Sequence, residues 1–220
     1  MSLRSILRGW RRLWRSWNPH AAAALLLLLA LPAARHYLES SMTRHMLVQF
    51  PLLALAGFLL AGKLPQRWLA GVNRWNGYGI TGLFAAALVL ALLMIPRVLD
   101  LALVNDRIEL AKWLALIACG AALRLSWAPA GLLIQGFFLG NVLPMTVVVG
   151  YLFESSPVRV CNAYLLDDQE RLGERLIWIS AATGLVWFAC LVRTLMQREA
   201  AAALDAAADE NRKPAESAAP

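Results

Sequence analysis

The stretch SSMTRHMLVQFPLLALAG, residues 40–57, begins with several polar residues and continues into an apolar run. Four side chains in it follow one another at intervals of three, one and three residues: Met42, His45, Met46 and Gln49. Residues three and four apart are neighbours along a helix surface, so this spacing predicts that the four side chains lie on one stripe. We therefore expect a helix whose face presents two thioethers, one imidazole and one amide.

The composition of the whole chain indicates an integral membrane protein. Hydrophobic residues make up 60% of the 220 residues and charged residues only 16%, and the mean hydropathy is +0.56, whereas about 25% of the residues in soluble domains are charged. A helix needs about 20 apolar residues to cross the hydrocarbon core. Segments of that kind occur at 18–34, 45–62, 78–96, 109–128, 130–153 and 175–196. They are continuously apolar and lack the alternation of barrel strands, which predicts an all-α, polytopic membrane helix bundle of about six transmembrane helices.

Lysine and arginine are unevenly shared between the two sets of connecting loops. The set that includes both chain ends holds more of them, and cytoplasmic loops of membrane proteins carry such an excess. We therefore predict that both termini are cytoplasmic. The net charge of +7 then suits contact with anionic headgroups of the lipid bilayer, and nucleic acid is not an expected partner.

This topology divides the chain into three parts. Residues 1–17 form a basic cytoplasmic amphipathic segment in which Trp and Arg are interleaved. Residues 18–197 form the six-helix transmembrane bundle, and residues 198–220 form a low-complexity cytoplasmic tail. The tail is rich in Ala with scattered charges, so we expect it to be frayed or disordered.

The predicted orientation places the stripe near the outer, non-cytoplasmic face, and His36 lies in the same outer connection. Thioether sulfur and imidazole nitrogen are donors that suit Cu(I). The candidate copper ligands are therefore Met42, His45, Met46 and His36. Gln49, one turn deeper, would support these ligands without binding the metal. The alternative is that the methionines fill space between helices and the histidines cap a helix end.

A second outer segment, LLDDQERLGERLIW at residues 165–178, leads into the last apolar run. One explanation for its acids is that they complement the positive N-terminal end of the helix dipole. The other is that Asp168 and Gln169 lie beside the Met and His stripe and orient or close it.

Polar and small residues also interrupt the apolar run at 130–153. Gln135 and Asn141 are either hydrogen-bonded to neighbouring helices or line a polar route for a solute. Gly136 and Gly140 form a GxxxG pair, which favours close helix packing. The chain lacks a phosphate-binding loop, a GxSxG nucleophile elbow and an HExxH zinc motif, so we expect no enzyme activity.

Two motifs give the chain a resemblance to a known family. MTRHMLVQFPLLALAG and, before the last apolar run, LLDDQERLGERLIW resemble the CtaG family of bacterial cytochrome c oxidase assembly factors. His45 and Met46 match the family's HM, and Asp168, Gln169 and Gly173 match its DQ with a following Gly. The chain departs from the family at Gln49, where the family often has His, and at Trp178, which comes slightly late after DQ.

The resemblance implies a multi-pass protein of the bacterial cytoplasmic (inner) membrane that helps to mature a copper-containing oxidase. The leading expectation is a non-enzymatic assembly factor that holds or delivers Cu(I) at the periplasmic face. Its partner would be a cytochrome c oxidase subunit or a copper donor protein. A metal-free scaffold for a respiratory complex is the alternative, and a small-solute transporter is a third hypothesis.

Overall fold

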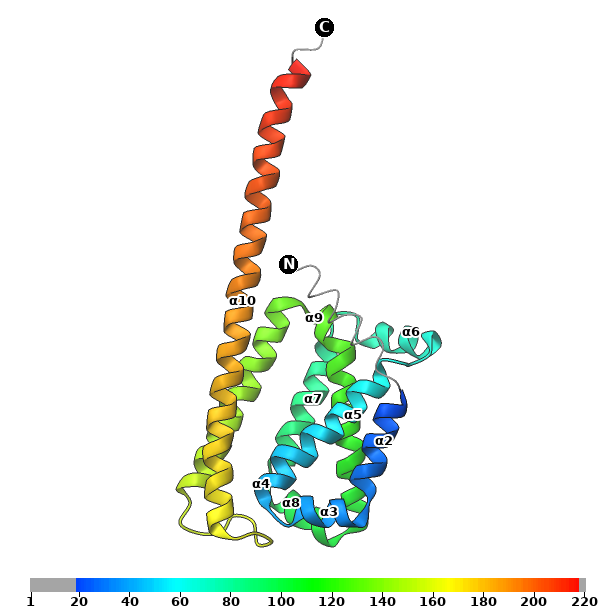
Figure 1. Ribbon diagram of the computed structural model, residues 1–220, viewed down its shortest axis with the longest axis vertical. Helices are drawn as coiled ribbons and strands as arrows, with labels where there is room; N and C mark the ends of the chain where they lie inside the picture. The colour runs from blue at the N-terminus through cyan, green and yellow to red at the C-terminus, as the bar shows by residue number, and fades with distance from the viewer. Residues whose placement is uncertain (1–18, 218–220) are drawn as a thin grey trace.

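The computed structural model describes residues 19–217, with side chains for residues 20–204, and this part of the chain contains helices and no strand. In chain order the elements are α2 (Pro19–Ala30), α3 (Pro32–Glu39), α4 (Met42–Arg44), η1 (His45–Gln49), α5 (Phe50–Ala61), α6 (Gln66–Trp75), α7 (Ile80–Leu93), α8 (Pro96–Val104), α9 (Asp106–Ser155) and α10 (Leu166–Ser217). They form a bundle with α3, α4 and α8 at one end, here named the α8 end, and α6 at the other, named the α6 end (Figure 1). The all-α prediction is confirmed. The amphipathic segment predicted at 1–17 lies outside the described residues.

α4, η1 and α5 form one helix from Met42 to Ala61, and its η1 part is π-helical. The N–H of Phe50 bonds to the carbonyl of His45, five residues back. Pro51 explains the wide turn, because it has no N–H to offer the carbonyl of Leu47 and its ring crowds the preceding turn. All four members of the predicted stripe are buried: Met42, His45, Met46 and Gln49.

The chain bends by 85° between α6 and α7, and small residues make the bend. Gly79 has a φ of 71°, and a Cβ on it would meet the backbone of Ser126 and Ala130 in α9, so glycine is required there. Asn76 fixes the bend, because its Nδ2 donates to Ser126 Oγ (2.8 Å) and its Oδ1 accepts from the N–H of Gly82 (2.9 Å). α6 therefore lies across the end of the bundle.

α9 consists of two arms that meet at Gly131. The 50-residue helix is interrupted there by a non-helical φ of 64° and ψ of 178°, two residues after Pro129. Figure 1 shows the chain reversing at this point, so that 106–130 packs within the bundle and 132–155 returns beside α10. α10 then runs back along the second arm and extends beyond the bundle (Figure 1).

Pairs of glycines allow the closest helix crossings. A Cβ on Gly57 of α5 would collide with the backbone of Ile117, and one on Gly120 of α9 with the backbone of Ala54. Small residues of this kind let helices approach closely in membranes, where apolar side chains gain little from leaving lipid. The first arm of α9 is thereby held tightly against α5.

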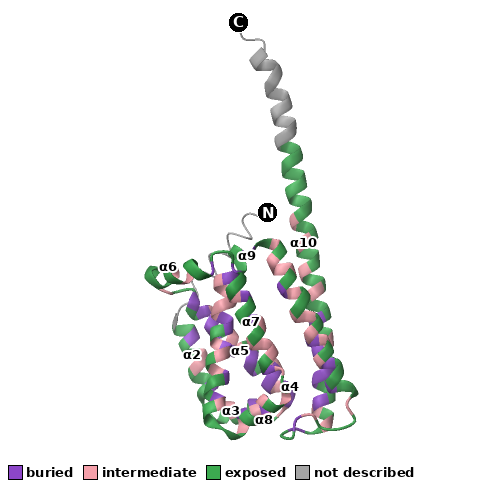
Figure 2. Ribbon diagram, turned by 180° about the vertical axis from the view of Figure 1, so that it is seen from behind, coloured by how far each residue is buried: buried purple, intermediate pink, exposed green. Residues whose placement is uncertain are grey.

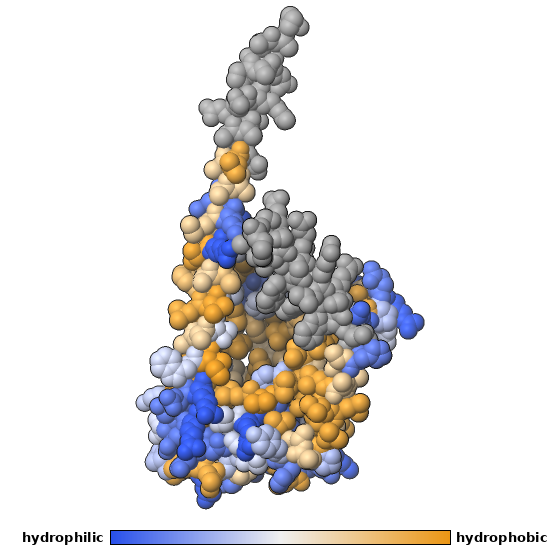
Figure 3. All heavy atoms as spheres, viewed as in Figure 1, coloured by the Kyte–Doolittle hydropathy of each residue, from blue (hydrophilic) through white to orange (hydrophobic). Residues whose placement is uncertain are grey.

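The surface is apolar around the middle of the bundle and hydrophilic at its ends (Figure 3). Large apolar side chains of α9 and α10 are strongly exposed, such as Leu133 (87%), Phe137 (75%) and Leu185 (71%). Buried residues gather among the helices and where α4 meets α10 (Figure 2). An exterior of this kind suits lipid, since a soluble protein rarely exposes so much contiguous apolar surface.

The number of spans and the tail differ from the sequence-based expectations. By length and composition, the described residues include three helices able to cross a membrane, or up to five if each bent helix pair counts as one span. This number is lower than the six predicted for two reasons. The helices of the pairs α2/α3 and α6/α7 are short and bent, and the two apolar runs at 109–128 and 130–153 form the single helix α9. The segment from Ala200, expected to be frayed, is helical to Ser217, which its many helix-favouring Ala residues explain.

Candidate functional site at the α8 end

Asp168 of α10 joins the two segments that the sequence singles out. Its carboxylate accepts hydrogen bonds from the Ser41 hydroxyl (2.9 Å), the Thr43 hydroxyl (3.2 Å) and the backbone N–H of Met42. The first N–H groups of a helix have no partner within it and carry partial positive charge, so a carboxylate stabilises them. The DQ segment therefore caps the helix that carries the HM pair.

His45 is wholly buried, and both of its ring nitrogens have partners. Nδ1 lies 2.6 Å from the Tyr164 hydroxyl, and Nε2 lies 2.9 Å from Nζ of Lys112. An ammonium group can only donate, so Nε2 accepts from Lys112 and the ring proton lies on Nδ1, which donates to Tyr164. The imidazole is thereby held in one tautomer between the connection that follows α9 and the first arm of α9.

Two ion pairs surround Lys112 in the interior. Its ammonium lies 2.7 Å from Oε2 of Glu109 and 3.9 Å from Oε1 of Glu39, and it donates to Oε1 of Gln49 at 3.3 Å. Arg35 Nε contacts Oε1 of Glu39 at 3.1 Å. Two cations and two carboxylates thus balance, as buried charges must if they are to be tolerated.

Further hydrogen bonds complete this buried charge network, which consists of Arg35, Glu39, His45, Gln49, Glu109, Lys112 and Tyr164. Trp113 Nε1 donates to Oε1 of Glu109 at 2.7 Å, and Gln49 Nε2 donates to Oε1 of Glu39 at 3.2 Å. Members come from α3, η1, α9 and the 156–165 connection. Buried ionisable groups are costly unless they are paired, so this network ties the elements it joins into one junction.

Gln169 holds the end of α9 against α10. Its Nε2 donates to the Phe153 carbonyl (3.0 Å), and its Oε1 accepts from the N–H of Val160 (2.8 Å). It is 1% exposed, so both polar ends are satisfied inside the protein. Gln169 therefore fixes the connection that brings Tyr164 to His45, without touching the imidazole.

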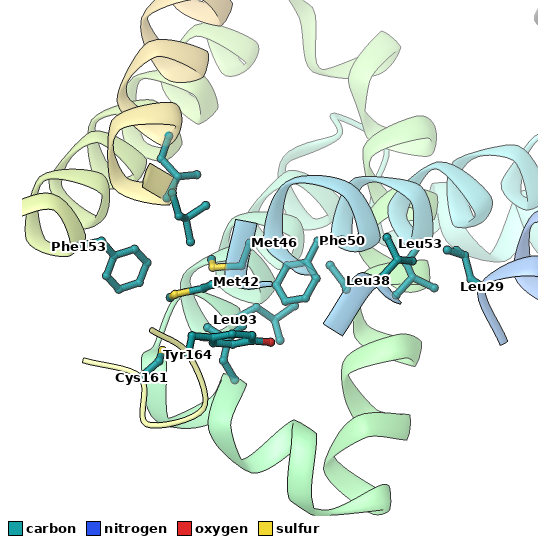
Figure 4. Close-up of a cluster of buried hydrophobic side chains, with 14 residues drawn as sticks. Leu29, Leu38, Met42, Met46, Phe50, Leu53, Leu93, Phe153, Cys161 and Tyr164 are labelled. Carbon is teal, nitrogen blue, oxygen red and sulfur yellow. The ribbon is translucent and has the colours of Figure 1, made fainter. Parts of the chain in front are cut away.

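The two methionines lie in an apolar cluster. Met42 is 0% and Met46 is 6% exposed, and the cluster includes Phe50 and Phe153. Figure 4 shows both thioethers reaching into this cluster, which also contains the Tyr164 ring. Met side chains are flexible and fill irregular gaps well, so the sulfurs pack between α10 and the rest of the bundle.

The structure does not bring the four candidate copper ligands together in a form that suits Cu(I). His36 is exposed on α3, whereas Met42, His45 and Met46 are buried. A cation bound to Nε2 of His45 would lie beside the Lys112 ammonium, which repels it. Among the described residues, no cluster of three or more His, Cys, Asp or Glu side chains could hold a metal ion. Both nitrogens of His45 are occupied in this arrangement, so Cu(I) could bind this imidazole only if Lys112 or Tyr164 moved away.

The connection after α9 is anchored by its own contacts. Asp100 of α8 accepts from the N–H groups of Asn162 (2.9 Å) and Ala163 (3.3 Å). Burial, with Asp100 nearby, raises the pKa of the Cys161 thiol to about 12, and burial also raises the pKa of Tyr164. Both groups are therefore protonated at neutral pH, so neither provides the anionic ligand that a metal prefers.

Sequence reasoning missed the charged members of the network: Arg35, Glu39, Glu109 and Lys112. Arg35 and Glu39 follow the apolar run at 18–34, and Glu109 and Lys112 stand at the start of the run at 109–128. The spacing was a usable signal, since Arg35 and Glu39 are four residues apart and Glu109 and Lys112 three apart, which places opposite charges on one helix face.

The two amides of the second α9 arm donate to backbone carbonyls of α9. Gln135 Nε2 donates to the Trp127 carbonyl and Asn141 Nδ2 to the Phe137 carbonyl, both at 2.7 Å within α9. One member of the predicted GxxxG pair lies at a close helix contact: a Cβ on Gly136 would lie 3.0 Å from the Trp187 ring of α10, whereas one on Gly140 would meet nothing within 4 Å. The described contacts therefore satisfy these amides locally.

No protein-family model matches the chain, and comparisons with curated proteins and with solved structures gave no match. The fold and the site show a helical membrane-type bundle with a buried, charge-balanced junction at one end. The resemblance to the CtaG family remains a prediction from its two motifs.

Proposed function

We propose that this protein is a membrane-embedded, non-enzymatic assembly factor for a respiratory cytochrome c oxidase. The observation that carries the proposal is the contact of Asp168 with Ser41 and Met42, 126 residues earlier in the chain for Met42. The two motifs that resemble the CtaG family are thereby parts of one junction. Each motif is short and only moderately specific on its own, so their contact supports the resemblance more than either motif does alone.

The proposed topology follows from the two arms of α9. We infer that 106–130 and 132–155 each cross the bilayer, since 25 or so residues of helix match its hydrocarbon thickness. With α2, α5, α7 and α10 this arrangement gives six crossings and puts both termini on one side. The excess of Lys and Arg assigns that side to the cytoplasm of a bacterium and the α8 end to the periplasm.

The proposed role is that of a metal-free scaffold for an oxidase subunit. The buried charge network is neutral as a whole and binds α3, η1 and α9 to one another, so it supports a rigid platform. Tyr37 (62% exposed) and Val104 (81% exposed) lie on helices of this end and are candidates for contact with a partner. Copper delivery through His45 would require this side chain to leave Lys112 or Tyr164.

A small-solute transporter is the less favoured proposal. It needs a polar path, and the two amides that suggested one, Gln135 and Asn141, bond to carbonyls of their own helix.

The test is the amount of assembled oxidase in membranes of a bacterium whose own copy of the gene is deleted. The haem absorbance of the oxidase should fall on deletion, return with the wild-type gene and stay low with Asp168→Asn. Asp167→Asn is the matched control, because Asp167 is the exposed neighbour. Unchanged oxidase on deletion would refute the proposal.

A further inference from the structure

The α6 end carries a groove that neither the buried charge network nor the proposed role uses. It has a volume of about 830 Å³, within the range of ligand sites. The α6 side is lined by Arg67, Trp68, Gly71, Val72 and Trp75, and the opposite side by residues of α7 and α9 that include Ala85, Ala118 and Ala122. Its floor is therefore made of small, apolar side chains, and its rim carries a cation and two indoles.

α6 has the placement of an interfacial helix. The bend of 85° sets it across the axis of α7, and Trp68 (60%), Trp75 (84%) and Tyr78 (79%) are exposed. Trp and Tyr concentrate at the level of lipid headgroups, where an apolar ring with a polar edge is best accommodated. The groove thus runs from headgroup level into the apolar depth along α7 and α9.

The charges of the segment around α6 have one sign. Lys63, Arg67 and Arg74 belong to the segment around α6, and no Asp or Glu occurs in the sequence between Glu39 and Asp100. None of the three cations forms an ion pair with another described residue. Unpaired cations beside an apolar groove at the cytoplasmic side of a bundle complement the phosphate and acyl chain of an anionic phospholipid.

We propose that the groove between α6, α7 and α9 binds one anionic phospholipid of the adjacent leaflet. An acyl chain lies over the alanines of α7 and α9, and the phosphate lies at the α6 rim, where Arg67 can bind it. Trp68 and Trp75 flank the glycerol region. A zwitterionic lipid would fill the same apolar floor but would gain less at the rim, so the site discriminates by charge.

Native mass spectrometry of the full-length protein, released from mixed vesicles of phosphatidylglycerol and phosphatidylcholine with identical acyl chains, tests the site. The wild type should retain phosphatidylglycerol at least several-fold over phosphatidylcholine. Arg67→Gln should abolish that preference, whereas Arg159→Gln, an exposed arginine at the α8 end, should preserve it. Equal retention of the two lipids by the wild type, or a preference unchanged by Arg67→Gln, would overturn the proposal.

A second pair of variants tests the groove itself. A Cβ on Gly71 would meet nothing within 4 Å, and the same holds for Gly140, so both positions accept a larger residue. Gly71→Leu places a side chain in the groove and should remove the bound lipid, while Gly140→Leu should retain it. Retention by Gly71→Leu equal to that of Gly140→Leu would place the lipid elsewhere and overturn the proposal.

Discussion

Gly150 of α9 and Gly173 of α10 pack backbone against backbone. A Cβ added to Gly150 would lie 2.8 Å from the Gly173 carbonyl oxygen, and one added to Gly173 would lie 2.7 Å from the backbone nitrogen of Glu154. Gly173 follows Asp168 and Gln169 on the same helix. The glycine that completes the DQ motif is therefore the point at which α10 crosses the second arm of α9.

Gly173→Leu should separate the two helices, because the backbone atoms that face its Cβ cannot move aside as a side chain can. We expect a loss of stability of about 3 kcal/mol or more, since overpacking of a close contact costs about 1–3 kcal/mol even where neighbours can shift. Thermal unfolding of the purified protein in detergent measures the change. Gly140→Leu, in open space on α9, should unfold within a degree or two of the wild type; equal effects of the two changes would show that the crossing is not tight.

Lys112→Met should be strongly destabilising, because it leaves Glu39 and Glu109 without their buried cation. Removing one partner of a buried ion pair costs about 3–5 kcal/mol. The double change Lys112→Met with Glu109→Leu should recover much of that loss, since an apolar pair of similar volume avoids the unpaired charge. Chemical unfolding of the three proteins measures this coupling, and a double variant less stable than Lys112→Met alone would contradict it.

Gln169→Leu should release the connection that carries Tyr164. The substitution leaves the Phe153 carbonyl and the Val160 N–H without their partner, at about 1–3 kcal/mol for each buried group. Limited proteolysis of the 156–165 connection should accelerate accordingly. Glu170→Leu, at the exposed neighbouring position, is the control, and equal cleavage rates in both variants would argue against this role of Gln169.

Cys161 should be inert towards maleimide in the folded protein. The thiol is 1% exposed and its pKa is raised to about 12, so at pH 7 to 9 almost none is present as the reactive thiolate. Because the folded state favours the protonated thiol, the stability from this group is fully present below the ordinary pKa of a thiol and is lost as the pH rises through the folded pKa of about 12. Val158→Cys in the same connection, at a 66% exposed position, should react quickly. Rapid labelling of Cys161 at pH 7 would contradict the burial.

The sequence predicts much of this fold because apolar length and charge placement are local properties. The helical class follows from continuous apolar length, and the spacing from Met42 to Gln49 predicts one stripe, although not its burial. The partners of the stripe do not follow from spacing, because Lys112 and Tyr164 reach His45 only through the crossing of helices far apart in the chain. The GxxxG spacing predicts only part of the contact between α9 and α10: Gly136 packs against Trp187, but the backbone-to-backbone crossing joins Gly150 and Gly173, which no local spacing pairs.

Two further differences between the sequence-based expectations and the structure have causes in the chemistry of single residues. Pro51 requires a disturbed turn before it, and the π-helical segment at His45 supplies that turn. The low complexity of the segment from Ala200 favours disorder, but Ala has the highest helix propensity, and the segment is helical to Ser217. In both places a single physical property of the residue decides the local structure.

The central claim is that the α8 end is a packed junction in which Met42 and Met46 act as core side chains rather than as copper ligands. The most direct measurement is the amount of assembled oxidase in cells that carry Met42→Leu with Met46→Leu, grown with ample and with limiting copper. Leu keeps the apolar volume at a cost below about 1.5 kcal/mol per site and removes the sulfur. The account predicts wild-type oxidase at both copper levels; an oxidase defect under limiting copper that added copper repairs would contradict it.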